Sequence, residues 1–257
     1  VYADLQGGNI KFTPIATGSL RGQVSTPSNV EQVYSFDDQA LTSNFKLFYD
    51  DSYDIINQAN LILEYTPSLT DATDAEKNQI KAEVLAIRAY THFLLSLVYS
   101  QDYNYTADAS HLGIVYSTAS IKGGVQYPAR KTAAETYALI INDLQTAIAN
   151  YSDSSLLSGA AYSFFNQKNT KALLARVYLQ KGDWTNAYET ANDVITNSGA
   201  ILTSKESLIA EWEKPDLPIS EILLEFAIAR DNENNVAGSM SKVFGYNTDQ
   251  SFEKYTA

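Results

Sequence analysis

The sequence predicts an all-α fold, built as an irregular stack of TPR-like antiparallel helix pairs with long loop insertions. Segment 171–195 carries small and large apolar residues at the offsets of a tetratricopeptide helix pair. Several other long segments place apolar residues at three- and four-residue steps, which is the period of a helix with one buried face. The segments are unevenly spaced, so the stack should be irregular. A single helix pair cannot bury its own apolar face, and this predicts stacked neighbours.

The residues of the tetratricopeptide-like segment have distinct packing roles. Ala175 and Ala187 are small enough to let two antiparallel helices approach, and Tyr178 fits between them. Gly182 is placed for the turn, since glycine readily ends a helix. Trp184 begins the second helix. We therefore expect helices over 166–181 and 184–197.

Helical periodicity and capping signals define the remaining elements. Thr73 is followed three residues later by Glu76, a typical start of a helix, and Thr132 occupies the same place before a second apolar stripe. The helices expected outside the tetratricopeptide-like segment cover about 41–64, 75–99, 133–150, 202–212 and, as a short element, 30–36. Segment 113–116 is expected to be extended, and 222–227 a strand or a buried loop. We expect one domain over 1–257, with helix pairs at about 41–100 and 132–197.

Composition excludes several classes of function. The net charge of −12, from 18 basic and 30 acidic residues, leaves no basic footprint for a nucleic acid and disfavours an anionic membrane surface. The chain has no cysteine, which removes disulfides, thiolate metal sites and cysteine nucleophiles. Its two histidines do not form a zinc site, and no cofactor is expected. We find no membrane-spanning run and no signal peptide, which predicts a cytosolic protein or a trimmed, mature secreted one.

Five segments, taken in order along the chain, resemble the SusD/RagB family of outer-membrane nutrient-binding lipoproteins. Two match its Ile-x-x-Ala-Asn helix and its Ala-Glu…Arg-Ala-Tyr…Phe helix, and a third matches its Arg-x-Thr…Tyr…Ile-x-x-Asp-Leu pattern. The others are the tetratricopeptide-like segment, with Gly-Asp-Trp at its turn, and a Ser-Glu-Ile sequence. In this chain they are Tyr53–Leu63, Ile80–Tyr99, Pro128–Ile148, Lys171–Ile195 and Ser220–Ile222.

The resemblance implies a location, a ligand class and a partner. Such proteins are surface-exposed lipoproteins of the Gram-negative outer membrane, held by an acylated N-terminal cysteine that this chain does not contain. They bind oligosaccharides, or in some members peptides, and deliver them to a TonB-dependent SusC-like transporter. Contact with the membrane is then expected only through the lipid anchor. Family members are generally longer, so the chain is expected to be a fragment or a short member.

Candidate ligand-binding residues follow from the chemistry of sugars. A sugar ring has apolar faces and hydroxyl edges, so exposed aromatic rings and amide or guanidinium groups suit its capture. Loop segments offer such residues in two places. Near the N-terminus they are Arg21, Tyr34 and Phe36, and after the second long helix they are Tyr103, Asn104 and Tyr105. No catalytic or metal-binding residue is expected.

Two other polar residues are expected to have structural roles. Arg88 lies within an apolar helix, so we expect it to pair with a buried carboxylate or a helix end, with Glu83 and Glu221 as the candidate partners. His92 lies in the same helix and is expected to be a hydrogen-bonded packing residue. His111 lies in the loop near Tyr105, where it can contact a ligand.

Three alternative functions remain open at the level of sequence. The chain can be a peptide-binding member of the nutrient-uptake family or an intracellular TPR-type adaptor that binds a protein segment. An adaptor favours uniform repeats, which the uneven spacing here does not provide. A glycan-active enzyme would need two carboxylates in a cleft, and turnover would reveal it.

Overall fold

The computed structural model describes residues 45–124, 126–152, 156, 159–212 and 220–226. These residues form helices and connecting loops, and none of them lies in a β-strand, as the sequence predicts. The chain divides into two compact units, 1–51 with 227–257, and 52–226. Of the first unit only residues 45–51 are described, where Lys46 and Asp50 form an ion pair. The short helix expected at 30–36 lies outside the described residues.

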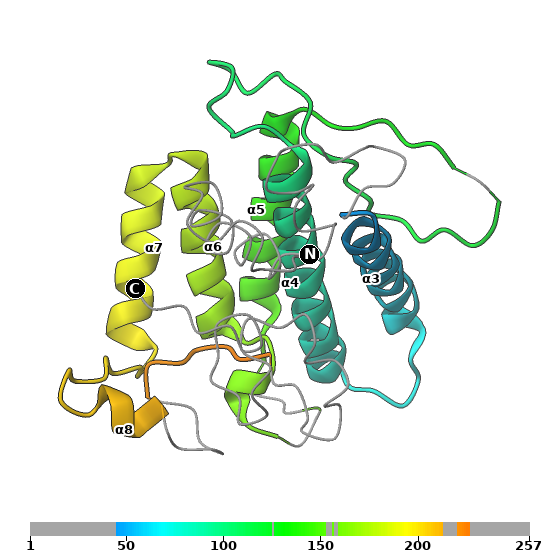
Figure 1. The fold of residues 1–257 in the computed structure, drawn as a ribbon. Helices are drawn as coiled ribbons and strands as arrows, with labels where there is room; N and C mark the ends of the chain where they lie inside the picture. Colours follow the sequence, from blue (N-terminus) through cyan, green and yellow to red (C-terminus); the bar gives the residue numbers. More distant parts are fainter. Residues whose placement is uncertain (1–44, 125, 153–155, 157–158, 213–219, 227–257) are drawn as a thin grey trace, which may run out of the picture. The chain divides into compact units, whose positions relative to one another are not determined.

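The second unit is built around a row of four helices (Figure 1). Helix α4 packs against α5, α5 against α6, and α6 against α7. A further helix, α3, begins in the first unit and extends through the start of the second, and two short 3₁₀ turns and a short helix complete the described elements. The bounds are α3 Lys46–Tyr65, η1 Thr66–Ser68, α4 Asp74–Tyr99, α5 Ala133–Asn150, η2 Ala161–Ser163, α6 Gln167–Lys181, α7 Trp184–Asn197 and α8 Leu208–Trp212. That the whole chain forms one domain stays a prediction.

Capping residues explain where two of these helices begin. The Thr73 hydroxyl accepts from the Glu76 backbone N–H, and the Glu76 carboxylate accepts from the Thr73 backbone N–H at 2.7 Å. Thr132 and Glu135 repeat the arrangement before α5. Each box satisfies donors that a helix N-terminus otherwise leaves unpaired. Both helix starts were therefore readable from sequence.

The α6–α7 pair has the geometry that its sequence predicts. Gly182 ends α6 with a left-handed backbone, φ 79°, and its N–H bonds the Leu179 carbonyl. Asp183 then caps α7 by accepting from the Asn186 N–H. Ala187 and Tyr178 are buried between the helices. The helix expected at 202–212 is wrong in extent, because the structure is helical only over Leu208–Trp212.

The core of the second unit lies along the row of helices. Its buried side chains come from α4, α5, α6 and α7, together with one residue of the loop before α5. They are Ala89, Phe93, Tyr116, Tyr137, Ile140, Leu144, Leu174, Val177, Tyr178 and Ala187. Burial of these apolar surfaces is the main favourable term that holds the helices together.

A long loop joins α4 to α5 and is held against the start of α5. The Gly113 N–H donates to the Lys131 carbonyl at 2.8 Å, and the Lys131 N–H donates to the Ile114 carbonyl at 2.8 Å. Leu112 and Thr132 form an isolated antiparallel bridge. The segment 113–116, expected to be extended, thus starts directly after this bridge, and its first two residues are hydrogen-bonded to Lys131. Residues 222–226, expected as a strand or buried loop, form no strand.

We expect Gly113→Ala to destabilise the protein by about 1–3 kcal/mol, the cost typical of overpacking a tight interior position. A Cβ atom there would lie 2.8 Å from the Thr132 carbonyl oxygen and would also clash with the Thr136 hydroxyl. Urea unfolding followed by circular dichroism measures the effect. An unchanged midpoint would show that the loop does not press on α5 as tightly as the structure indicates.

Candidate functional site

A buried polar network joins helices α3, α4 and α5 to the loop between α4 and α5. Arg88 donates from Nε and Nη2 to the two carboxylate oxygens of Asp143, each at 2.8 Å. Its Nη1 donates to Asn60 Oδ1 at 2.8 Å, and the Tyr116 hydroxyl donates to Asp143 Oδ2 at 2.7 Å. Burial opposes the charge of Arg88, but the Asp143 carboxylate outweighs it and raises the pKa of Arg88. The buried-carboxylate role predicted for Arg88 is therefore confirmed.

The candidate partners predicted for Arg88 are wrong. Glu83 accepts a hydrogen bond from Gln79 at 2.7 Å, and Glu221 accepts one from the Thr203 backbone N–H at 2.9 Å. Asp143 replaces them because α4 and α5 pack side by side. No local sequence pattern predicts the pairing of Arg88 with Asp143, because the two residues lie far apart in the chain.

His92 is the second polar residue of this region, and its predicted packing role is confirmed. Its side chain is fully buried, and its ring stacks on Tyr116 with centroids 3.8 Å apart. Nδ1 lies 2.9 Å from the Arg88 carbonyl, and the Ser117 backbone N–H donates to Nε2 at 3.2 Å. These partners fit a neutral ring with its proton on Nδ1. Burial lowers the pKa of His92 to about 3.

The same loop is also fixed to helix α3. The Tyr53 hydroxyl donates to the Val115 carbonyl at 2.8 Å, and Asn57 accepts from the Ile121 N–H at 2.7 Å. Glu64 accepts from the Ser120 N–H at 2.9 Å and pairs with Lys122 at 2.7 Å. The bond from Lys122, aided by the Ser120 N–H, lowers the pKa of Glu64 to about 2. Side chains of α3 therefore hold the loop from 115 to 122.

The first part of the loop lies against the turn between α6 and α7. This turn and the C-terminal end of α4 lie on the same side of the row of helices (Figure 1). Asp102 accepts from the Asn104 backbone N–H at 2.9 Å and from Gln180 of α6 at 3.2 Å. The Asn104 amide lies 3.2 Å from where a Cβ of Gly182 would stand. The end of α6 and the turn after it thus contact the segment that carries three of the predicted ligand residues.

The structure places these three residues differently. Tyr103 is half-buried and packs edge-on against Tyr137 of the core, with ring centroids 5.0 Å apart. Its ring is therefore used in packing. Asn104 is exposed, and Tyr105 is 66% exposed. His111 lies beside Tyr105 with centroids 5.5 Å apart, and its Nδ1 is 2.9 Å from the Thr106 hydroxyl.

The loop therefore exposes the Asn104 amide and the Tyr105 ring, and the half-buried His111 ring packs beside Tyr105. We call Asn104, Tyr105 and His111 the loop surface. Sequence reasoning identified Asn104 and Tyr105, and it named His111 as a possible contact. The three N-terminal candidates, Arg21, Tyr34 and Phe36, lie outside the described residues.

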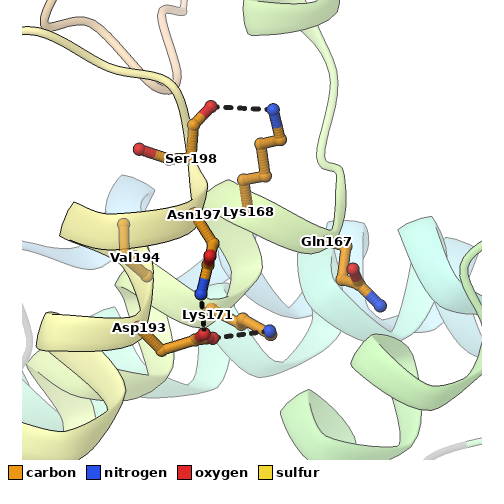
Figure 2. Close-up of a pocket in the computed structure, with 7 residues that line it drawn as sticks. All are labelled: Gln167, Lys168, Lys171, Asp193, Val194, Asn197 and Ser198. Atoms are coloured by element: carbon orange, nitrogen blue, oxygen red, sulfur yellow. Dashed lines mark hydrogen bonds and ion pairs between the residues drawn. The ribbon is translucent and has the colours of Figure 1, made fainter.

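A hollow between α6 and α7 is the second place where polar groups gather (Figure 2). Lys171 of α6 and Asp193 of α7 form an ion pair of 2.6 Å, and Asn197 donates to the other Asp193 oxygen at 2.6 Å. Lys168 donates to the Ser198 carbonyl at 2.7 Å. Figure 2 shows Lys171 and Asn197 directed toward Asp193, and Lys168 directed toward Ser198.

The hollow adjoins a more open groove, since Lys171 and Asp193 line both. We call this more open groove the α5–α7 groove. Its lining residues are Gln145, Ile148, Lys171, Leu174, Glu189, Thr190 and Asp193. Sequence reasoning missed it, because the three helices that form it are brought together only by packing.

The described residues contain no helix long and apolar enough to cross a membrane. Among the same residues, no group of three or more histidines and carboxylates is placed to hold a metal ion. Within the part of the chain that the structure describes, the loop surface and the α5–α7 groove are two candidate sites for a ligand.

Comparisons with known proteins show which family the chain resembles. Residues 2–179 match the model of a SusD-like family described as starch-binding and associating with the outer membrane. A SusD-like protein of Bacteroides ovatus is 28% identical over 213 residues, which cover 77% of this chain but 36% of that protein. The chain thus spans little more than a third of that relative's length.

Solved structures show the same fold. A SusD superfamily protein of Bacteroides thetaiotaomicron is 27% identical, with a TM-score of 0.72, and the match covers 82% of this chain and 46% of that one. A SusD-like carbohydrate-binding protein of Bacteroides vulgatus is similar in fold, with a TM-score of 0.63 at 21% identity over 72% of this chain and 38% of that one. The family model covers more than half of the chain, and the protein therefore belongs to the SusD-like family.

Proposed function

We propose that the protein captures oligosaccharides at the surface of the outer membrane without cleaving them and delivers them to a TonB-dependent transporter. Membership of a family described as starch-binding and associating with the outer membrane supports this proposal. Attachment as a surface-exposed lipoprotein and partnership with a SusC-like transporter belong to the same proposal.

The loop surface is the observation that carries the proposal. Tyr105 exposes an aromatic ring, which suits the apolar face of a sugar, and Asn104 is an exposed amide that can bond hydroxyl groups. The bonds of Asp102 to the loop and to Gln180 hold the segment in place. A surface fixed before binding loses less conformational entropy when the ligand arrives.

The binding residues are tested by titrating soluble glucans and other oligosaccharides into the protein in a calorimeter. We expect a dissociation constant on the order of micromolar to millimolar, and Tyr105→Ala should weaken it about three- to tenfold, the loss of one stacking contact. Tyr127→Ala is the matched control, because Tyr127 is a 92% exposed tyrosine elsewhere on the loop. It should bind as the wild type does.

One further variant and two assays make the result decisive. Glu189→Ala probes the α5–α7 groove, and a loss confined to this variant would move the site from the loop surface to the groove. Chromatography of the titrated mixtures detects shortened oligosaccharides, and their appearance would contradict non-catalytic capture. Binding of short peptides in place of every oligosaccharide would contradict the ligand class.

A further inference from the structure

The imidazole of His111 packs against the exposed ring of Tyr105 and is itself held in place by the loop and by α5. The two rings meet edge to face, with centroids 5.5 Å apart and planes at 76°. Nδ1 of His111 lies 2.9 Å from the Thr106 hydroxyl, which also accepts from the His111 backbone N–H at 3.4 Å. The His111 carbonyl accepts from the Ala133 N–H at the start of α5, at 2.8 Å. Tyr105 therefore contacts a side chain whose own position is fixed.

The backbone between Tyr105 and His111 turns sharply, and this turn brings the two rings together. Ala109 has a left-handed backbone, φ 52°, which is uncommon for a residue with a Cβ atom. Its N–H donates to the Thr106 carbonyl, and its own carbonyl accepts from the Ala134 N–H of α5, each at 3.0 Å. The first turn of α5 thus stabilises the fold-back of the loop that sets the contact between the rings.

Within the part of the chain that the structure describes, His111 makes the one ring contact of Tyr105. The rest of the Tyr105 side chain is largely exposed. Its backbone N–H donates to the Asp102 carbonyl at 3.0 Å, but this bond leaves the side-chain torsions free. A sugar that stacks on a mobile ring has to immobilise it, and the lost rotamer freedom weakens binding. A fixed neighbour that restricts the ring before binding reduces this loss.

The hydrogen bonds of His111 indicate which part of its side chain acts on Tyr105. Nε2 of His111 is buried and has no hydrogen-bond partner among the described residues, whereas both ring nitrogens of His92 have partners. A buried Nε2 is closed to a ligand while Tyr105 covers it, so His111 contributes the body of its ring. We propose that His111 is a positioning residue that holds the Tyr105 ring ready for a sugar to stack on it. This inference rests on the proposed function and adds the residue that orients its stacking ring.

Double-mutant cycles in the calorimetric titration test the proposal. His111→Ala should weaken binding of the best-binding oligosaccharide about two- to tenfold, and His111→Phe, which keeps a ring beside Tyr105, should recover most of that loss. Added to Tyr105→Ala, His111→Ala should cost nothing further, because it acts through that ring. Added to Asn104→Ala, it should cost its full factor.

Three results of these cycles would overturn the proposal. Equal losses from His111→Phe and His111→Ala would make the imidazole nitrogens, and not the ring, the important groups. Losses from His111→Ala and Tyr105→Ala that multiply would show that His111 does not act through Tyr105. A loss from His111→Ala that disappears in the Asn104→Ala background as well would show a general collapse of the loop.

Nuclear magnetic resonance of the free protein measures the same contact without a ligand. The ring signal of Tyr105, in a chain with isotope-labelled tyrosine, is assigned by its loss in Tyr105→Phe. In His111→Ala we expect this signal to move toward that of a solvent-exposed ring, for which the 92% exposed Tyr127 is the reference. A Tyr105 signal that His111→Ala leaves unmoved would overturn the proposal. If the wild type binds no oligosaccharide, the proposed function fails, whereas this comparison still decides whether His111 fixes the ring.

Discussion

Replacing Asp143 by alanine is expected to lower the free energy of unfolding by about 3–5 kcal/mol, the cost of leaving a buried charge without its partner. Arg88 would keep its guanidinium in the interior without its carboxylate partner, and the Tyr116 hydroxyl would lose its bond to Asp143 as well. Urea unfolding of the wild type and the variant, with the midpoint and slope compared, measures the difference.

Two further variants isolate the cause. Lys122→Met breaks an exposed pair with Glu64 and should move the unfolding midpoint far less, because water screens that pair. Arg88→Met combined with Asp143→Leu removes both buried charges and should recover part of the loss caused by Asp143→Ala. If Asp143→Ala unfolds at the same urea concentration as the wild type, the buried ion pair does not contribute as the structure indicates.

Acid is expected to destabilise the protein through His92. Its pKa falls from 6.5 to about 3 on folding, chiefly because burial disfavours the charged ring. Between these two values the unfolded chain binds a proton that the folded chain does not, so stability falls as the pH falls through this window. The linkage slope is at most about 1.4 kcal/mol per pH unit for one group. The effect should be absent above the unfolded pKa.

His92→Gln tests this assignment. Unfolding free energies of the wild type and the variant should converge as the pH is lowered from about 7 to about 4.5, because the variant lacks the penalty. The carboxylates titrate in both proteins and cancel from the comparison. Replacement of His111, the other histidine of the chain, provides the reference for losing a histidine outside the buried network. Parallel pH curves for wild type and His92→Gln would contradict the neutral, buried state of His92.

Local signals made much of the fold predictable. The helices at 133–150 and 184–197 agree with the structure at both ends. Their starts follow from the N-caps Thr132 and Asp183, because such caps depend on residues close in sequence. The turn at Gly182 needed a left-handed residue, and glycine supplies it. The segment expected to be helical over 202–212 is helical in the structure only from Leu208.

Long-range pairing was less predictable. Arg88 was expected to meet a carboxylate, but Asp143 became its partner through the packing of α4 on α5. Tyr103 and Tyr105 look alike in sequence, yet one packs on Tyr137 and the other is exposed. The sequence pattern indicates that both tyrosines lie in a loop. Which of their side chains faces the core depends on the helices that pack beneath the loop.

A crystal structure of the protein with its best-binding oligosaccharide tests the central claim most directly. The account predicts a sugar ring stacked on Tyr105, with a hydroxyl within hydrogen-bond distance of the Asn104 amide. A sugar held only in the α5–α7 groove, or at a surface that contains neither residue, would contradict it.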